Sequence, residues 1–234
     1  NYICHINYPT SSDMKIHILG IGGTFMAGIA IIAKEMGYDV TGSDTNLYDP
    51  MKTVLINNKI SFTENYNSKT LDNKYDLIIV GNVMTRGMDI IEKLLDKKIP
   101  FTSGPEWLYD NVLSKKTVIA ISGTHGKTTT SSLVTHILKY AKKNPSYLIG
   151  GLPIGIKSPA KLTNSEYFVI EADEYDTAFF DKRSKYLHYH PNVMVINNIE
   201  FDHADIFENI EAIIKNFNHV LRTMPRSGKI IYNA

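Results

Sequence analysis

The residues with the clearest chemical pattern lie in the segment 117–130, which reads TVIAISGTHGKTTT. An apolar, β-branched run predicts a strand over 118–121, and residues 126–143 have the pattern of a helix. That helix is expected to bury one apolar face, formed by Leu133, Val134, Ile137, Leu138 and Ala141. Backbone N–H groups at the start of a helix have no partner within the helix and attract phosphate oxygens. The segment therefore predicts a phosphate-binding loop.

The loop is shorter than the common P-loop, G-x-x-x-x-G-K-[ST], which would require a glycine where Ile121 stands. Lys127 would bring a positive charge to the phosphates, and the Thr128 hydroxyl would ligate a phosphate-bound Mg²⁺. A chance GKT in a loop is the alternative, but the strand before it and the helix after it favour nucleotide binding. The candidate ATP-binding residues are Gly123, Thr124, His125, Gly126, Lys127, Thr128 and Thr129.

Carboxylates follow a second apolar run. Residues 167–170 (YFVI) predict a strand that leads directly into 171–176 (EADEYD). In P-loop proteins an acid on a neighbouring strand completes the Mg²⁺ site, and Glu171 is best placed because it comes first after the apolar run. A solvated acidic loop is the alternative, but the phosphate loop upstream favours metal binding.

A histidine follows a third apolar run. Residues 193–197 predict a strand, and the chain continues as NIEFDHAD over 198–205. Ligands gather at the ends of parallel strands, so His203 is predicted to complete a second Mg²⁺ position or to orient a phosphate. The alternative is a helix-capping Asp-His-Ala-Asp turn.

Glycines also follow the first predicted strand, which covers 15–19 (KIHIL). Gly20, Gly22, Gly23 and Gly28 allow a tight turn and close backbone approach before a helix over 25–36 and a second strand over 39–42. Asp44 then stands at the end of that strand. The third glycine of G-x-G-x-x-G would fall at Phe25, so we do not expect NAD. A nucleotide phosphate on this helix start remains the prediction, with simple helix–strand packing as the alternative.

Further strand and helix patterns alternate between these sites. We expect strands over 75–80 and 99–102, a helix over 88–97, and a surface strand and loop within 57–73. Gly104-Pro105 is expected to break the chain before a helix over 106–113. The predicted fold class is α/β, with a Rossmann-like domain over 14–114 and a P-loop domain over 115–234. Residues 1–13 are interpreted as a leader or a cloning remnant.

Composition excludes several classes of protein. Hydrophobic residues make up 43% and charged residues 21%, as in ordinary soluble globular proteins. Because 25 basic residues stand against 24 acidic ones and no basic stripe is present, we expect no nucleic-acid partner. No apolar stretch approaches the ~20 residues of a membrane span, so no membrane contact is expected. The single cysteine, Cys4, fits a reducing compartment, and we expect a cytoplasmic protein.

The motifs together carry a family resemblance. The loop, acid and histidine motifs of the muramyl branch of the Mur ligases are similar to GTHGKTT at 123–129, EADE at 171–174 and NIEFDH at 198–203. The glycine turn GIGG at 20–23 is similar too. The resemblance extends from Met14 to the end of the chain.

The resemblance implies a reaction and a site. ATP, with Mg²⁺, would phosphorylate the lactyl carboxylate of UDP-N-acetylmuramate, and the amine of a peptide would then attack the acyl phosphate. Lys127, Glu171 and His203 would be catalytic, and Thr128, Glu171 and His203 would hold metal. The implied UDP-substrate residues are Gly20, Gly22, Gly23, Thr24, Phe25, Met26, Asp44 and Asn82.

Three stretches bear on the choice of amine. Segments 23–28, 102–108 and 171–189 are most similar to the ligases that add L-alanyl-γ-D-glutamyl-meso-diaminopimelate in peptidoglycan recycling. The ligases that add L-alanine are the alternative within the family. A non-catalytic UDP-sugar- or ATP-binding module is another, and a P-loop kinase a third, although the glycine-rich first region argues against a kinase.

The family also has a third, carboxy-terminal domain. Because the chain ends at Ala234, we expect an incomplete central domain and a piece that is inactive alone. No oligomeric state is assigned.

Overall fold

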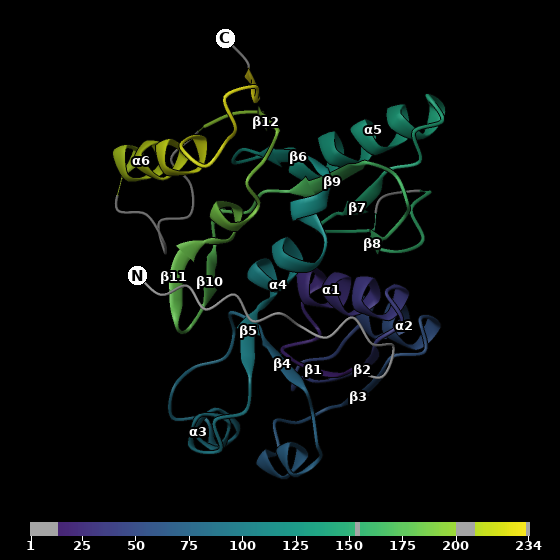
Figure 1. The fold of residues 1–234 in the computed structure, drawn as a ribbon, viewed down its shortest axis with the longest axis vertical. Helices are drawn as coiled ribbons and strands as arrows, with labels where there is room; N and C mark the ends of the chain where they lie inside the picture. The colour runs from purple at the N-terminus through teal and green to yellow at the C-terminus, as the bar shows by residue number, and fades with distance from the viewer. Residues whose placement is uncertain (1–13, 153–154, 200–208, 233–234) are drawn as a thin grey trace.

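A computed structural model describes residues 14–152, 155–199 and 209–232 of the chain. These residues fold around two large β-sheets. In Figure 1 the two sheets lie in the lower and upper halves of the molecule, with helices α1 and α4 between them. The described residues contain no helix that is long and apolar enough to cross a membrane. This architecture confirms the predicted α/β class. The predicted leader, residues 1–13, lies outside the described residues.

The first sheet is parallel throughout. From edge to edge its strands are β3 (Ser61–Thr63), β2 (Asp39–Ser43), β1 (Lys15–Leu19), β4 (Leu77–Val80) and β5 (Phe101–Ser103). The chain runs outward from β1 in one direction to β3 and then crosses to β4 on the other side. Ligands bind where the strand order reverses, at the carboxyl ends of the strands. The loops after β1 and β4 therefore flank the expected site.

Helix α1 (Thr24–Glu35) is enclosed on all sides, since every residue from 26 to 33 is buried. A helix that is apolar all round belongs in a core. A Cβ atom added at Gly28 would meet the side chains of Leu148 and Ala160 at 3.1 and 3.3 Å. Gly28 therefore lets α1 approach the second sheet. The close approach predicted for the glycines of this segment is, at Gly28, an approach to the second sheet.

The remaining helices of this region are short. They are α2 (Met51–Asn57), the 3-10 helix η1 (Ser68–Asp72), α3 (Asp89–Asp96), α4 (Gly104–Asn111) and the 3-10 helix η2 (Leu113–Lys115). The expected chain break at Gly104-Pro105 is wrong, because α4 begins at Gly104, and Ser103 caps it by accepting from the Glu106 N–H at 3.3 Å. Proline is tolerated in the first turn, where its missing N–H has no helical acceptor. The domain boundary proposed between residues 114 and 115 falls within η2.

The second sheet begins at residue 117. Its order is β13 (Lys229–Tyr232), β12 (Val193–Ile196), β6 (Thr117–Ser122), β9 (Tyr167–Glu171), β7 (Ser146–Leu148) and β8 (Ala160–Lys161). All pairs are parallel except β7 with β8. Helix α6 (Ile210–Leu221) precedes β13. Because β6 lies between β12 and β9, the carboxyl ends of these three strands meet at one edge.

Helix α5 (Lys127–Tyr140) follows β6, but its buried face differs from the prediction. Ser131 and Thr135 are buried and Val134 and Leu138 pack beside Ile121, whereas Leu133 and Ile137 are 56% and 54% exposed. Ala141 lies at the exposed carboxyl end of the helix. Small hydroxyl residues face the sheet because the helix begins close to it, at the phosphate loop. Apolar spacing alone therefore predicted Val134 and Leu138 correctly but not the rest of the buried face.

An antiparallel hairpin joins the two halves. Its strands are β10 (Asp176–Ala178) and β11 (Asp181–Ser184), followed by the 3-10 helix η3 (Lys185–His188). At its tip the Phe180 ring lies 5.1 Å from the Phe101 ring of β5, centroid to centroid, and Phe179 packs on the core of the first sheet. Figure 1 shows the hairpin reaching from the upper half toward β5.

Candidate active site in the cavity between the two sheets

A cavity of ≈ 1140 Å³ lies between the carboxyl ends of the two sheets. Lys127 and Glu171 line it from the second sheet. Every residue predicted from the resemblance to contact the UDP substrate lines it as well, namely Gly20, Gly22, Gly23, Thr24, Phe25, Met26, Asp44 and Asn82. The structure thus places the first-domain residues and two of the predicted catalytic residues around one space. A ligand can bridge both sheets there.

Asp44 holds the glycine turn at one end of the cavity. Its Oδ2 accepts from the Gly22 N–H at 2.7 Å and its Oδ1 from the Asn46 N–H at 2.9 Å. Asp44 is almost fully buried. Helix α1 starts immediately afterwards, and Gly23 provides no side-chain cap. The first-turn residues Thr24, Phe25 and Met26 line the cavity, so their N–H groups suit phosphate oxygens.

The phosphate loop is anchored by residues that follow β12. The His125 N–H donates to Asn198 Oδ1 at 2.9 Å, and the Asn197 side-chain amide donates to Thr130 Oγ1 at 3.0 Å. Gly126 caps α5 with φ 80°, a left-handed conformation that favours glycine. Sequence reasoning had assigned no role to either asparagine, although Asn198 opens the NIEFDH motif. Their place just after a strand parallel to β6 was the available signal.

Lys127 folds back on its own loop. Its ammonium donates to the Gly123 carbonyl at 2.6 Å and lies 3.7 Å from Glu174 Oε2. Glu174 is 4% exposed, and its other carboxylate oxygen accepts from Ser122 Oγ at 3.4 Å. Glu174 was part of the predicted acidic run, but only the fold shows that it turns toward Lys127.

Glu171 lies at the end of β9 against the start of α5. Its Oε1 accepts from Ser131 Oγ at 3.2 Å, and the same hydroxyl lies within hydrogen-bond distance of the Lys127 and Thr128 carbonyls. A Cβ atom at Gly150 would come within 2.5 Å of Glu171 Oε2. Gly150 therefore lets the chain pass directly over the carboxylate.

Two of the three predicted Mg²⁺ ligands, Thr128 and Glu171, lie near each other. Thr128 and Glu171 both adjoin Ser131 and the Gly150-Gly151 segment. Over 14–152, 155–199 and 209–232, no group of three or more His, Cys, Asp or Glu side chains is placed to hold a metal ion. A hydroxyl and a carboxylate would thus need phosphate oxygens and water to complete the shell, as Mg²⁺ usually does at nucleotide sites. His203 lies outside the described residues.

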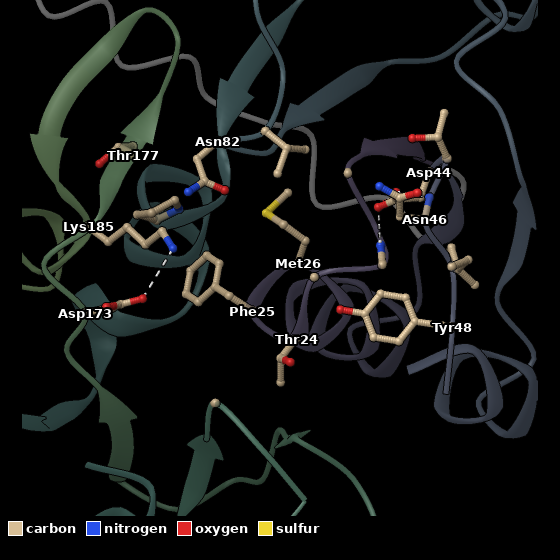
Figure 2. A pocket seen from close by; sticks show the side chains of 18 of the residues that line it. Thr24, Phe25, Met26, Asp44, Asn46, Tyr48, Asn82, Asp173, Thr177 and Lys185 are labelled. Atoms are coloured by element: carbon tan, nitrogen blue, oxygen red, sulfur yellow. Dashed lines mark hydrogen bonds and ion pairs between the residues drawn. The ribbon is translucent and has the colours of Figure 1, made fainter. Parts of the chain in front are cut away.

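Figure 2 shows the cavity from close by. Lys185 and Asp173 lie on one side, Asp44, Asn46 and Tyr48 on the other, and Phe25 and Met26 between them. The Lys185 ammonium lies 3.7 Å from Asp173 Oδ2. Lys185 itself is only 8% exposed. Sequence reasoning assigned no role to this pair. The signal was weak, since Lys185 is one of several basic residues in DKRSK.

Comparison with known proteins finds relatives along both halves of the chain. Residues 15–116 match the Mur ligase family, catalytic domain, and residues 121–234 match the Mur ligase middle domain. The UDP-N-acetylmuramate–L-alanyl-γ-D-glutamyl-meso-2,6-diaminoheptandioate ligase of Escherichia coli (strain K12) is 51% identical over 219 residues, which are 94% of this chain and 48% of that protein. The UDP-N-acetylmuramate–L-alanine ligase of Dictyoglomus turgidum is 32% identical over 94% of this chain and 45% of its own length.

A solved structure extends the match to three dimensions. The crystal structure of the UDP-N-acetylmuramate:L-alanyl-γ-D-glutamyl-meso-diaminopimelate ligase from Neisseria meningitidis superposes with a TM-score of 0.90 at 48% identity. The alignment covers 94% of this chain and 71% of that one. The chain spans about half the length of the curated relatives it matches.

Proposed function

The chain belongs to the Mur ligase family, and we propose that it supplies the sugar-nucleotide site and much of the ATP site of a ligase acting on UDP-N-acetylmuramate. One observation carries the proposal. The glycine turn of the first sheet and Lys127 and Glu171 of the second line a single cavity. A sugar nucleotide held at the glycine turn can extend its sugar toward phosphates held at the loop. A reaction that consumes ATP and a UDP-sugar is expected in the cytoplasm.

The residues suggest how the chain would act. The first-turn N–H groups of α1 would bind the diphosphate, with Asp44 fixing the turn. Lys127 would leave the Gly123 carbonyl and stabilise negative charge on the γ-phosphate of ATP as the lactyl carboxylate attacks it. Thr128 and Glu171 would hold Mg²⁺, which neutralises phosphate charge. ADP would leave as the acyl phosphate forms, and attack by an amine would then form the amide and release inorganic phosphate and a proton.

We further propose that the amine belongs to the tripeptide L-alanyl-γ-D-glutamyl-meso-diaminopimelate. The support is similarity: identity is 51% to a relative named for that peptide and 32% to one named for L-alanine.

The test is a ligation assay. A full-length ligase carrying this sequence would be given ATP, Mg²⁺, UDP-N-acetylmuramate and either the tripeptide or L-alanine, with products identified by mass. We expect product from the tripeptide and little from L-alanine. If product formed only with L-alanine, the amine substrate would be L-alanine and not the tripeptide. If calorimetry showed no binding of UDP-N-acetylmuramate to the 234-residue chain, the proposal of a sugar-nucleotide site would be wrong.

A further inference from the structure

Lys185 is a buried cation in the wall of the cavity. It is 8% exposed, and its ammonium lies 3.7 Å from Asp173 Oδ2, longer than a direct hydrogen bond. It also lies over the rings of Phe25, at 5.4 Å from the centroid, and Tyr175, at 5.8 Å. Burial lowers the pKa of Lys185 below its usual value. Burying an ammonium group costs free energy unless a partner compensates its charge. A buried lysine in the wall of a cavity is therefore a candidate for binding an anionic ligand.

The position of the Lys185 ammonium is set by the packing of the preceding hairpin and by the contact with Asp173. Lys185 begins η3, directly after the hairpin β10–β11, and the tip of that hairpin packs on the first sheet through Phe179 and Phe180. The partner carboxylate, Asp173, comes two residues after Glu171 on the loop that follows β9. The Lys185 side chain therefore contacts Asp173, on the loop after β9 of the second sheet, while the tip of the preceding hairpin packs on the first sheet.

The charges around the cavity distinguish its two sides. Of its lining residues in the described part of the chain, the basic ones are Lys127 and Lys185, and the acidic ones are Asp44, Glu64, Glu171 and Asp173. Lys127 is held by the phosphate loop. In Figure 2 Lys185 lies across from Asp44, Asn46 and Tyr48, on the far side of Phe25 and Met26. The second cation therefore stands across the cavity from Asp44, the residue that holds the glycine turn.

A sugar nucleotide with an acidic sugar carries two kinds of anion. The diphosphate has donors already, in the uncapped first turn of α1. The carboxylate on the sugar must instead lie near the phosphate loop, where it would react. Lys185 lies beside Asp173, which follows Glu171 by two positions on the loop after β9, and it therefore lines the cavity from the part of the chain that also contributes Lys127 and Glu171.

We propose that Lys185 recognises the lactyl carboxylate of UDP-N-acetylmuramate and so distinguishes this sugar nucleotide from one without an acid. The inference rests on the proposed function. Asp173 and the two aromatic rings hold the ammonium in place before the substrate arrives. The carboxylate then gives the buried charge its second partner.

The test compares two ligands on the 234-residue chain by calorimetry. UDP-N-acetylmuramate carries the lactyl group, and UDP-N-acetylglucosamine lacks it. We expect Lys185→Met to weaken binding of the first by about ten- to a hundredfold, the usual weight of a hydrogen bond to a charged group, and binding of the second by less than about twofold. Lys185→Arg should retain most of the affinity. Lys182→Met, which removes a 70% exposed lysine from the same hairpin, is the matched control and should change neither ligand.

Each other outcome is decisive. Equal weakening of both ligands by Lys185→Met would mean that Lys185 serves the diphosphate or only the fold, and unchanged binding of both would mean that it serves neither; either result overturns the inference. If Lys185→Met fails to fold, Lys185→Gln, which keeps a polar head without the charge, takes its place under the same expectations. A wild-type chain that binds UDP-N-acetylmuramate no better than UDP-N-acetylglucosamine would sink the proposed substrate together with the inference. A wild-type preference that Lys185→Met leaves intact would sink the inference alone.

Discussion

The ammonium of Lys127 lies 3.7 Å from the carboxylate of Glu174, and both side chains are largely buried. The lysine also donates to the Gly123 carbonyl at 2.6 Å. The cation of the phosphate loop is therefore held by its own loop and by an acid. An incoming phosphate would exchange one anionic partner for another, which lets the loop hold a charged lysine in both states.

Lys127→Ala is expected to abolish ligation in a full-length ligase carrying this sequence, because a lysine on a transferring phosphoryl group commonly contributes several kcal/mol in the transition state. Binding of UDP-N-acetylmuramate to the 234-residue chain should change by less than about threefold, since the diphosphate is expected at α1. Calorimetry and a ligation assay measure the two effects. Lys139→Ala, an exposed lysine on the same helix, is the control. Loss of sugar-nucleotide affinity along with activity would contradict this division of roles.

Glu174→Gln should destabilise the chain by about 1–3 kcal/mol, because it leaves the largely buried ammonium of Lys127 without its acid. ATP with Mg²⁺ would restore an anionic partner, so nucleotide should raise the melting temperature more for this variant than for the wild type. Thermal unfolding with and without ATP checks both effects. An equal rise in the two proteins would show that phosphate does not replace Glu174.

Much of the fold follows from local patterns. KIHIL, YDLIIV and TVIAIS are apolar runs bounded by glycine or polar residues, and all three contain strands of the predicted sheets. Helix α2 was missed because MKTVLIN follows Pro50 in a polar stretch and buries only Met51, Val54 and Leu55. The buried face of α5 was predicted only in part, because the closeness of the helix to the sheet favours the small residues Ser131 and Thr135 there.

The site was predictable where its chemistry depends on backbone position. Glycines after β1 and the GKT loop mark turns that the chain must make at strand ends, whatever packs around them. Glu174 and Lys185 were not predictable in the same way. Each is one of several like charges within a short run, and only the loop after β9 and the hairpin β10–β11 decide which charge turns inward.

Gly150→Ala tests the position of Glu171. The added methyl group would come within 2.5 Å of Glu171 Oε2, and the end of a flexible side chain can move to relieve that contact. We therefore expect an intact fold and a melting temperature within a few degrees of wild type, but a severalfold higher Mg²⁺ requirement for ATP binding, as expected also for Glu171→Gln. Titration of ATP affinity against Mg²⁺ is the measurement.

The matched control is the neighbouring glycine. Gly151→Ala places its methyl group 3.4 Å from Thr128 Cγ2, an ordinary contact, and should have a much smaller effect. A Gly150→Ala variant with an unchanged Mg²⁺ requirement would argue against a metal-binding role for Glu171.

The last prediction concerns the pH dependence of stability and the buried His17 of β1. Burial lowers the pKa of His17 from 6.5 to about 4, and its ring nitrogens pair with Thr41 Oγ1 and Ser43 Oγ, both at 2.8 Å. The unfolded chain takes up a proton near pH 6.5 and the folded chain does not until about pH 4. The contribution of His17 to stability is thus fully present above pH 6.5 and is lost as the pH falls toward 4, by up to about 3 kcal/mol. Urea unfolding at several pH values between 7.5 and 4.5 measures the slope, and His17→Gln, which cannot titrate, should show a shallower one. Identical slopes in the two proteins would mean that other groups carry the acid sensitivity.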